Sequence, residues 1–254
     1  MASRLKRIIC LGLFAAAVSV PVSADVVNVF AYKDNTLYES PSGSLSNGAG
    51  ESIFAGRTLQ FQDSLRRALL AFDVAGAVPA GSTIVSATLR LYCIQSVSGD
   101  QPMTLHRTLQ NWGESTSSAD GMGGGGGGAF AMPGDATWLH TFSPGSFWAN
   151  VGGDFNAAAS ASALVGGGGA IYQWSSPQMA LDVQNWLDNP AANFGWTLLG
   201  NETFDGSAKR FASRETTNIF AIKPTLVIEY IPEPATVCLF ALGLAGVARR
   251  RRAL

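Results

Sequence analysis

The chain has 254 residues, with 17 Lys and Arg against 18 Asp and Glu, and a formal charge of −1. Charged residues make up 14% of it, well below the roughly 25% of an average soluble protein, which excludes a disordered polyelectrolyte and a protein of long helices. Much of the positive charge lies at the two ends, so residues 25–231 carry 10 basic and 17 acidic side chains, a charge of −7. Binding to a phosphate backbone requires clustered Lys and Arg, and we therefore expect no nucleic-acid partner.

The N-terminus has the three parts of a secretory signal peptide. Basic residues within the first seven positions precede an apolar stretch at 8–20 and small residues up to Ala24. We expect residues 1–24 to form a signal helix that signal peptidase removes by cleavage after Ala24. The apolar stretch is shorter than the about 20 residues of a membrane-spanning helix, which argues against a retained anchor.

Residues 25–231 are expected to form one domain of short strands. Apolar and polar residues alternate most clearly over residues 83–95 and, just before them, over residues 66–73. Cys93, the only cysteine of this domain, falls on the apolar face, where a buried structural role is expected. Further strands are expected at 26–32, 36–39, 52–55, 103–109, 136–142, 171–174, 194–199, 209–212 and 225–231. Many short strands separated by Gly, Pro, Ser and Asn predict an all-β antiparallel sandwich.

One short helix is expected within this all-β pattern. It begins at Pro177 after Ser176, carries an apolar stripe that includes Trp186, and ends at Asn189-Pro190. Strands and helices do not alternate along the chain, which argues against a parallel α/β sheet.

The domain lacks the residue sets of familiar catalytic and zinc sites. Its only histidines, His106 and His140, lie in strand-like segments, and no Gly-x-Ser-x-Gly motif occurs. Two distant histidines and a core-facing cysteine do not form a zinc ligand set. Pairs of carboxylates cannot be assigned from spacing, and a structural Ca²⁺ in the loops stays open and unassigned. We expect a protein without catalytic residues or cofactor.

Aromatic side chains are the strongest binding signal. All six tryptophans lie within residues 25–231, and Trp186 and Trp196 are expected in the core because their neighbours follow a helical and an alternating pattern. Trp112, Trp138 and Trp148 lie in more open segments and are candidates for stacking on sugar rings. The alternative is that these three also belong to the core.

The C-terminus combines Pro232-Glu233-Pro234, an uncharged stretch at 235–248 and a run of arginines made up of Arg249, Arg250, Arg251 and Arg252. This order closely resembles the PEP-CTERM sorting signal of Gram-negative bacteria that make exopolysaccharide. The resemblance implies that residues 232–254 are held in the inner membrane as a hydrophobic helix and recognised by an exosortase. A plain C-terminal anchor is the alternative.

Several blocks that span most of residues 25–231 are similar to the DNRLRE-type domain. They are Asp34-Asn35-Thr36-Leu37-Tyr38-Glu39, Arg67-Ala68-Leu69-Leu70-Ala71-Phe72-Asp73, residues 79–91, Trp112-Gly113-Glu114, residues 134–138 and 194–196, and Lys209-Arg210-Phe211-Ala212-Ser213-Arg214-Glu215. The resemblance implies a β-sandwich of jelly-roll type that is secreted and often attached to polysaccharide-active or surface proteins. Relatives have been grouped with carbohydrate-binding modules.

Arg214 and Glu215 near the last strands, with Asn201-Glu202, could line a polar binding groove. The favoured alternative is a structural network, in which an arginine pairs with a nearby carboxylate. Its expected members are Arg67, Arg210 and Arg214 with Asp73, Glu202 and Glu215.

These observations predict a secreted, non-enzymatic protein of the cell envelope or extracellular matrix that binds polysaccharide. One alternative is a matrix protein or adhesin that binds protein; a polysaccharide lyase or hydrolase is less favoured. The charge of −7 on residues 25–231 favours neutral glycans, acidic glycans bridged by divalent cations, or protein.

Overall fold

The structure is a computed structural model that describes residues 23–233. Residues 24–233 form a compact unit, and none of the helices in the described part is long and apolar enough to cross a membrane. Ala24, Pro232 and Glu233 lie at the ends of this unit. The helices expected in the signal peptide and at the C-terminus, together with Pro234 and the arginines at 249–252, lie outside the described residues.

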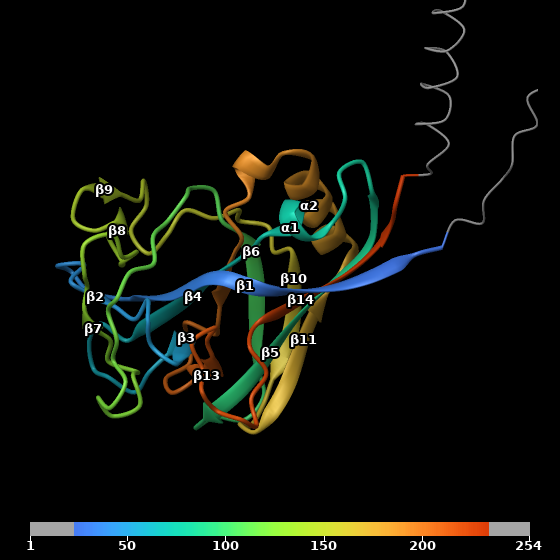
Figure 1. Ribbon diagram of the computed structural model, residues 1–254. Coiled ribbons are helices and arrows are strands. Elements are labelled where there is room, and N and C mark those ends of the chain that lie inside the picture. Colours follow the sequence, from blue (N-terminus) through green and yellow to red (C-terminus); the bar gives the residue numbers. More distant parts are fainter. Residues whose placement is uncertain (1–22, 234–254) are drawn as a thin grey trace, which may run out of the picture. The chain divides into compact units, whose positions relative to one another are not determined.

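The first of two sheets is built on two long strands. β1 (Asp25–Tyr38) and β5 (Thr83–Ser96) are both 14 residues long and are separated by β14 (Thr225–Ile231), while β11 (Ala170–Ser175) pairs with the other edge of β5. The order β1–β14–β5–β11 is antiparallel throughout (Figure 1). Strands distant in sequence thus become neighbours.

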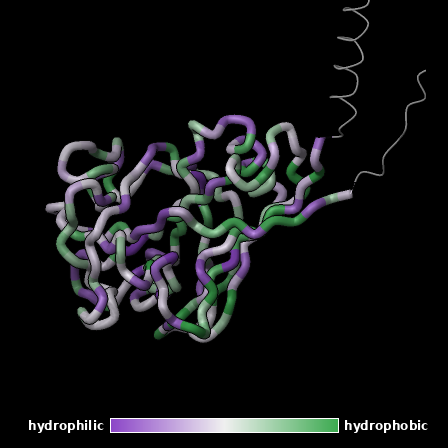
Figure 2. Tube along the Cα trace, viewed as in Figure 1, coloured by the Kyte–Doolittle hydropathy of each residue, from purple (hydrophilic) through white to green (hydrophobic). Residues whose placement is uncertain are grey.

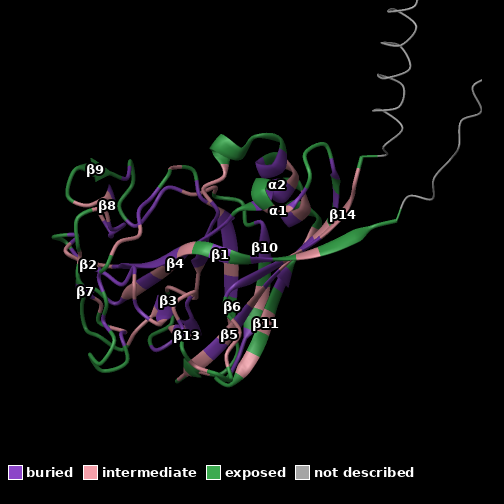
Figure 3. Cartoon of the chain, viewed as in Figure 1, coloured by how far each residue is buried: buried purple, intermediate pink, exposed green. Residues whose placement is uncertain are grey.

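β1 also opens the second sheet, because its pairing changes partner along its length. A register irregularity between Ala31 and Lys33 marks the change, and the C-terminal half of β1 pairs with β4 (Leu65–Phe72). The sheet continues through β12 (Trp196–Leu199) and β6 (Gln101–Arg107), and its last strand is β10 (Ala161–Val165). Figure 3 shows β1 exposed at its start and buried after the change of partner.

Two further strands connect the sheets at the opposite side. β13 (Lys209–Ala212) pairs with β5 and β3 (Ser52–Arg57), and β3 pairs with β4. The pairings β1–β14–β5–β13–β3–β4–β1 therefore close into a ring. Two short ribbons lie outside it and pair β2 (Leu45–Ser46) with β7 (Ala129–Phe130) and β8 (His140–Phe142) with β9 (Ser146–Phe147).

The main core lies between the two sheets. Hydrophobic and hydrophilic residues alternate along the strands (Figure 2), and the buried set includes Leu91 and Cys93 of β5, Phe72 of β4 and Trp174 of β11. Cys93 is a free cysteine with no exposed surface, which confirms the burial expected from the alternation. Burial of alternating apolar side chains on both sheets supplies the main stabilisation of the fold.

α2 (Pro177–Asp188) is the embedded helix, with the bounds that the sequence predicts. Ser176 caps it, since its Oγ accepts the Met179 N–H at 3.0 Å, and Pro177 stands in the first turn where no N–H partner is needed. Trp186 packs edge-on against Trp196 with ring centroids 4.4 Å apart, so both are core residues as expected. Two shorter helices, α1 (Val74–Ala77) and η1 (Pro190–Ala192), lie beside α2.

A second, smaller core lies on the outer face of the second sheet. The long connection at 108–160, between β6 and β10, covers this face and brings its tryptophans onto Leu37, Leu69 and Ala71. The strand expected at 136–142 is therefore reduced to β8, because Ala136 and Trp138 pack into this core as irregular backbone. The pattern of the sheet strands does not reveal that their outward side is covered too.

The other strand predictions agree with the structure to within a few residues, apart from the differences below and the two-residue strands β2, β7 and β9, which the sequence does not predict. The segments expected at 26–32 and 36–39 are one continuous strand, and β10, rich in small residues, is not expected from the sequence. The alternation over residues 83–95 predicts that Val85 is buried on the same face as Cys93, but it is 46% exposed, because the pairing of β5 with β14 shifts register opposite Glu229 and Tyr230. The domain is mostly β with few helices.

Candidate functional site

The three tryptophans proposed to contact a ligand are buried, contrary to the openness expected of them. Trp112, Trp138 and Trp148 are 1%, 8% and 5% exposed. Their rings fill the second core, and the indole N–H groups of Trp112 and Trp148 donate to the carbonyls of Phe194 and Thr137, both at 2.9 Å. A glycan needs an accessible ring face for stacking, which these rings do not offer. The correction follows from the connection at 108–160, which uses its aromatic residues to cover a sheet.

Two pairs of the arginine network expected as the structural alternative are present, whereas Arg210 donates to Ser52 Oγ at 2.8 Å. Arg67 donates to both carboxylate oxygens of Glu202, at 2.7 and 2.9 Å, and stacks over the ring of Trp138 at 4.8 Å. Arg214 pairs with Glu215 at 2.8 Å. Asp73 instead caps α1 by accepting the Gly76 N–H. Arg67 therefore joins distant segments, which is the structural role that the sequence favours, whereas Arg214 and Glu215 are neighbours in the chain.

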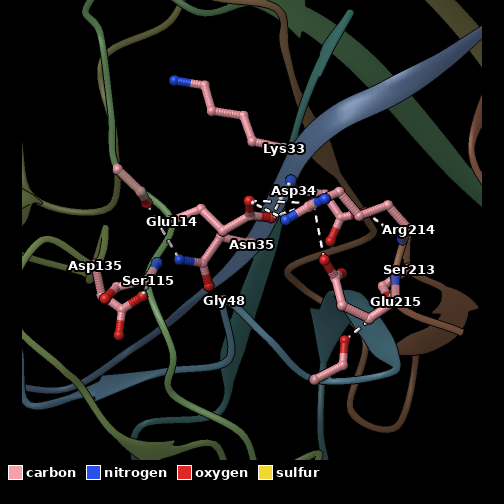
Figure 4. Close-up of polar contacts among 12 residues, drawn as sticks. Lys33, Asp34, Asn35, Gly48, Glu114, Ser115, Asp135, Ser213, Arg214 and Glu215 are labelled. Atoms are coloured by element: carbon pink, nitrogen blue, oxygen red, sulfur yellow. Dashed lines mark hydrogen bonds and ion pairs between the residues drawn. The ribbon is translucent and has the colours of Figure 1, made fainter.

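Arg214 also lies at the centre of a cluster of three carboxylates, Asp34, Glu114 and Glu215 (Figure 4). We refer to these three residues as the acidic cluster. One carboxylate oxygen of each lies within 4.8 Å of the others, although Asp34 belongs to β1, Glu114 to the loop after β6, and Glu215 to the loop after β13. The fold thus concentrates negative charge from three separate segments at one point.

The local backbone geometry holds the Glu114 carboxylate beside Asp34. Asp34 follows the irregularity of β1, and its N–H donates to Glu114 Oε1 at 2.7 Å. Gly113 immediately before Glu114 lies against Gly134, whose carbonyl oxygen would be 1.8 Å from any added Cβ atom. Only glycine permits this close approach, and the approach sets the direction in which Glu114 leaves the loop.

Arg214 partly neutralises the acidic cluster. Its backbone N–H donates to Asp34 Oδ2 at 2.7 Å, and its guanidinium group donates to Glu114 through Nε and a terminal nitrogen, the shorter contact being 2.8 Å. Figure 4 shows the guanidinium group between the carboxylates of Glu114 and Glu215. One positive charge therefore faces three carboxylates.

Two carboxylate oxygens of the cluster are buried and have no hydrogen-bond partner within residues 23–233. They are Asp34 Oδ1 and Glu215 Oε2. Burial and the nearby Glu215 raise the pKa of Asp34 well above its usual value, and burial raises the pKa of Glu215 to about 6. Burial also raises the pKa of Glu114, against the opposing effect of Arg214. The cluster therefore resists full ionisation unless further positive charge reaches it.

Lys33 is the other cation in this neighbourhood, and its ammonium group is engaged elsewhere. It donates to the Trp112 carbonyl at 2.6 Å and to Asn111 Oδ1 at 3.0 Å, and it lies 4.2 Å from the Trp112 ring centroid. Figure 4 shows it extending away from Asp34. Burial lowers the pKa of Lys33 to about 8, against the charge of Glu114, which raises it. Lys33 holds the loop of Glu114 in place rather than satisfying the free carboxylate oxygens.

The outer face of the first sheet is open, in contrast to that of the second. Directly paired positions share a face, and the row Phe30–Thr225–Arg90–Gln173 crosses β1, β14, β5 and β11 on the side opposite the core. Phe30 is 61% exposed, and the next outward row pairs Tyr92 with Ile171, which is 39% exposed. We call these outward residues, together with Asn28, the open face. It combines aromatic rings with amide and guanidinium groups.

The comparison with family models indicates where the protein is sorted but does not indicate an activity. Residues 231–252 match the PEP-CTERM protein-sorting motif, which indicates an exported protein that is processed by an exosortase. The sorting involves the membrane transiently and leads to the cell surface or the exterior. Comparison of the sequence with curated proteins gives no significant match.

Asp34 and Glu114 were not expected as site residues, although each lies in a motif quoted above. The blocks that begin at Asp34, Trp112 and Lys209 each contribute one member of the acidic cluster. The sequence signal that they share is their position in blocks that resemble the DNRLRE-type domain, which other acidic residues such as Glu39 and Asp73 share too. Their convergence cannot be read from spacing, because Asp34 is 80 residues from Glu114 and 180 from Arg214.

Proposed function

We propose that the exported domain binds an extended polysaccharide on the open face. The observation that carries this proposal is the uncovered row of Phe30, Arg90 and Gln173 beside Tyr92. Aromatic rings stack on the apolar faces of sugar rings, and amide and guanidinium groups bond their hydroxyl groups. The buried tryptophans have no part in this binding.

Arg90 adds a second reason to place the ligand here. Its Nε is buried and has no hydrogen-bond partner among the described residues, and the residues paired with it, Thr225 and Gln173, carry no charge. The buried Nε itself does not reach a ligand, but a partly exposed guanidinium group without a carboxylate partner can offer its terminal nitrogens to hydroxyl or carboxylate groups of a ligand. The open face therefore offers charge and hydrogen-bond donors between the exposed ring of Phe30 and the half-buried ring of Tyr92.

We propose further that the domain is a jelly roll related to the DNRLRE-type domain. The support is the strand order, β1–β14–β5–β11 in one sheet and β4–β12–β6–β10 in the other. Passing along the chain through these strands, every step changes sheet except the one from β6 to β10. Such alternation is typical of the paired Greek keys of a jelly roll, and the quoted motifs support the family relationship.

We propose a binding role without catalysis. A hydrolase or lyase needs a free carboxylate that reaches the sugar, whereas in the acidic cluster Asp34 has no exposed surface and Glu114 and Glu215 are paired with Arg214. His106 and His140 are hydrogen-bonded to Asn156 and Thr104, and to Thr137, in buried positions. Their contacts are those of structural histidines.

Affinity electrophoresis tests the binding proposal. The full chain, purified in detergent, is run through gels containing the exopolysaccharide of the producing cells, a neutral glucan or a uronic-acid polymer. We expect retardation by at least one polymer, and loss of retardation in Phe30→Ala. Phe61→Ala is the matched control, since Phe61 is 99% exposed but belongs to the loop between β3 and β4. No retardation by any polymer, or equal retardation of both variants, would refute binding on the open face.

A second candidate function is adhesion to protein, which an exposed apolar groove favours. Leu59 and Val97 are 75% and 72% exposed and line this groove with Phe54 and the glycine tract at 123–126. Exposed apolar surface of this kind can mark a protein contact. If Leu59→Asn releases the protein from the cell surface and Phe30→Ala does not, adhesion replaces polysaccharide binding as the primary function.

A further inference from the structure

We propose that the acidic cluster of Asp34, Glu114 and Glu215 is a Ca²⁺ site that locks together β1 and the loops after β6 and β13. This inference concerns the interior of the domain and is independent of polysaccharide binding on the open face.

The first argument is the unpartnered oxygen of Asp34. Asp34 has no exposed surface, its Oδ2 accepts the Arg214 N–H, and its Oδ1 has no donor among the described residues. A buried acceptor without a partner is costly, and native structures supply water, an ion or a protein donor in such places. Glu215 Oε2 is a second buried oxygen without a donor, and it belongs to the same cluster.

The second argument is the balance of charge. Three carboxylates face the single guanidinium group of Arg214, which leaves two negative charges when all are ionised. Lys33 is nearby but directs its ammonium group to Asn111 and Trp112. A divalent cation would remove the excess charge, whereas a monovalent one would leave half of it.

The third argument is the distance between the ligand atoms. The oxygens lie within 4.8 Å of one another, a span that one Ca²⁺ with bonds of about 2.3–2.6 Å can bridge. Arg214 donates hydrogen bonds to Glu114 and pairs with one oxygen of Glu215. The oxygens of Asp34 and Glu215 that have no partner are therefore left for the ion. The ion and the guanidinium group would then share the cluster from different sides.

The ligand chemistry selects the class of metal. All three side chains are carboxylates, so neither imidazole nor thiolate is present to favour Zn²⁺ or copper. Mg²⁺ usually keeps several of its waters, which suits a fully buried ligand such as Asp34 poorly, whereas Ca²⁺ accepts irregular sets of carboxylate and carbonyl oxygens.

Calcium titration of the full chain tests this proposal. The protein, purified in detergent and freed of metal with EGTA, is titrated with CaCl2 by calorimetry, and its Tm is measured with and without Ca²⁺. We expect saturable binding of one ion and a rise in Tm. Asp34→Asn and Glu215→Gln should each weaken the affinity by about tenfold or more, because each removes one charged ligand.

Asp205→Asn is the matched control, because the Asp205 side chain is 78% exposed and lies outside the cluster. It should bind Ca²⁺ as the unaltered chain does. Absence of heat and of any Tm shift in the unaltered chain would overturn the proposal, and so would a shift that survives both cluster substitutions. If Asp34→Asn does not fold, Glu215→Gln decides the question. Glutamine has the same shape as glutamate, and the Glu215 side chain is not fully buried, so this variant is expected to fold.

Discussion

The outer faces of the two sheets of this domain differ in whether other segments cover them. The outer face of the second sheet is covered by the connection at 108–160, which places three tryptophans against Leu37, Leu69 and Ala71. The outer face of the first sheet carries Phe30 and other side chains that no segment of the described chain covers. Apolar and polar residues alternate along the strands of both sheets. This alternation distinguishes the two faces of a sheet but does not show whether the outer face is exposed to solvent.

Aromatic residues therefore have different roles on the two faces. On the covered face they stabilise the domain, and on the open face they are free to contact a ligand. Substitutions should therefore separate into those that lower the free energy of unfolding and those that lower binding without lowering stability.

The largest effect is expected for Trp112→Ala on the covered face. Trp112 is 1% exposed and its indole N–H donates to the Phe194 carbonyl, so truncation leaves a cavity and an unpaired carbonyl group. We expect a loss of about 3–5 kcal/mol in the free energy of unfolding, measured by urea denaturation. Phe30→Ala on the open face is the control and should change stability by less than about 0.5 kcal/mol. Similar losses for the two variants would contradict the distinction between the faces.

A smaller loss of stability is expected for Arg214→Ala, which leaves Glu114 and Glu215 without their shared cation. Because the Arg214 side chain is 38% exposed, we expect a loss of about 1–3 kcal/mol, with Arg214→Lys intermediate since an ammonium group cannot bridge both carboxylates in the same way. Binding to polysaccharide should be unchanged. A variant of normal Tm that no longer binds glycan would return Arg214 to the role of a ligand-binding residue.

The burial of Cys93 between the two sheets determines the pKa and the reactivity of its thiol. Burial raises the pKa of its thiol from 9.0 to about 11, and the thiol has no exposed surface. The folded state thus binds this proton more tightly than the unfolded chain, so its contribution to stability is full below pH 9 and is lost as the pH rises towards 11. We expect iodoacetamide to label Cys93 at pH 8 only after denaturation, as read by mass spectrometry of its peptide. Rapid labelling of the native chain would show that the two sheets do not enclose it.

Local patterns predicted the elements and failed to predict what covers them. The helix that begins at Pro177 follows from a cap, a proline and a stop signal, and the strand over residues 83–95 follows from its own alternation. The burial of Trp138 depends instead on a connection that crosses a sheet formed by distant strands. The acidic cluster depends on a strand and two loops that are distant in sequence, so its members are visible in the sequence while their proximity is not.

The smallest effect on stability, and the sharpest test of the open face, is expected for Arg90→Gln. Arg90 has no carboxylate partner among the described residues, so its loss should change the free energy of unfolding by no more than about 0.5 kcal/mol. If the ligand is an acidic polysaccharide, the substitution should abolish retardation by a uronic-acid polymer, since the domain at −7 otherwise repels it. If the ligand is neutral, glutamine keeps hydrogen-bonding capacity and retardation by glucan should fall only slightly. The variant thus distinguishes the two classes of glycan, and unchanged binding to both would exclude Arg90 from the binding face.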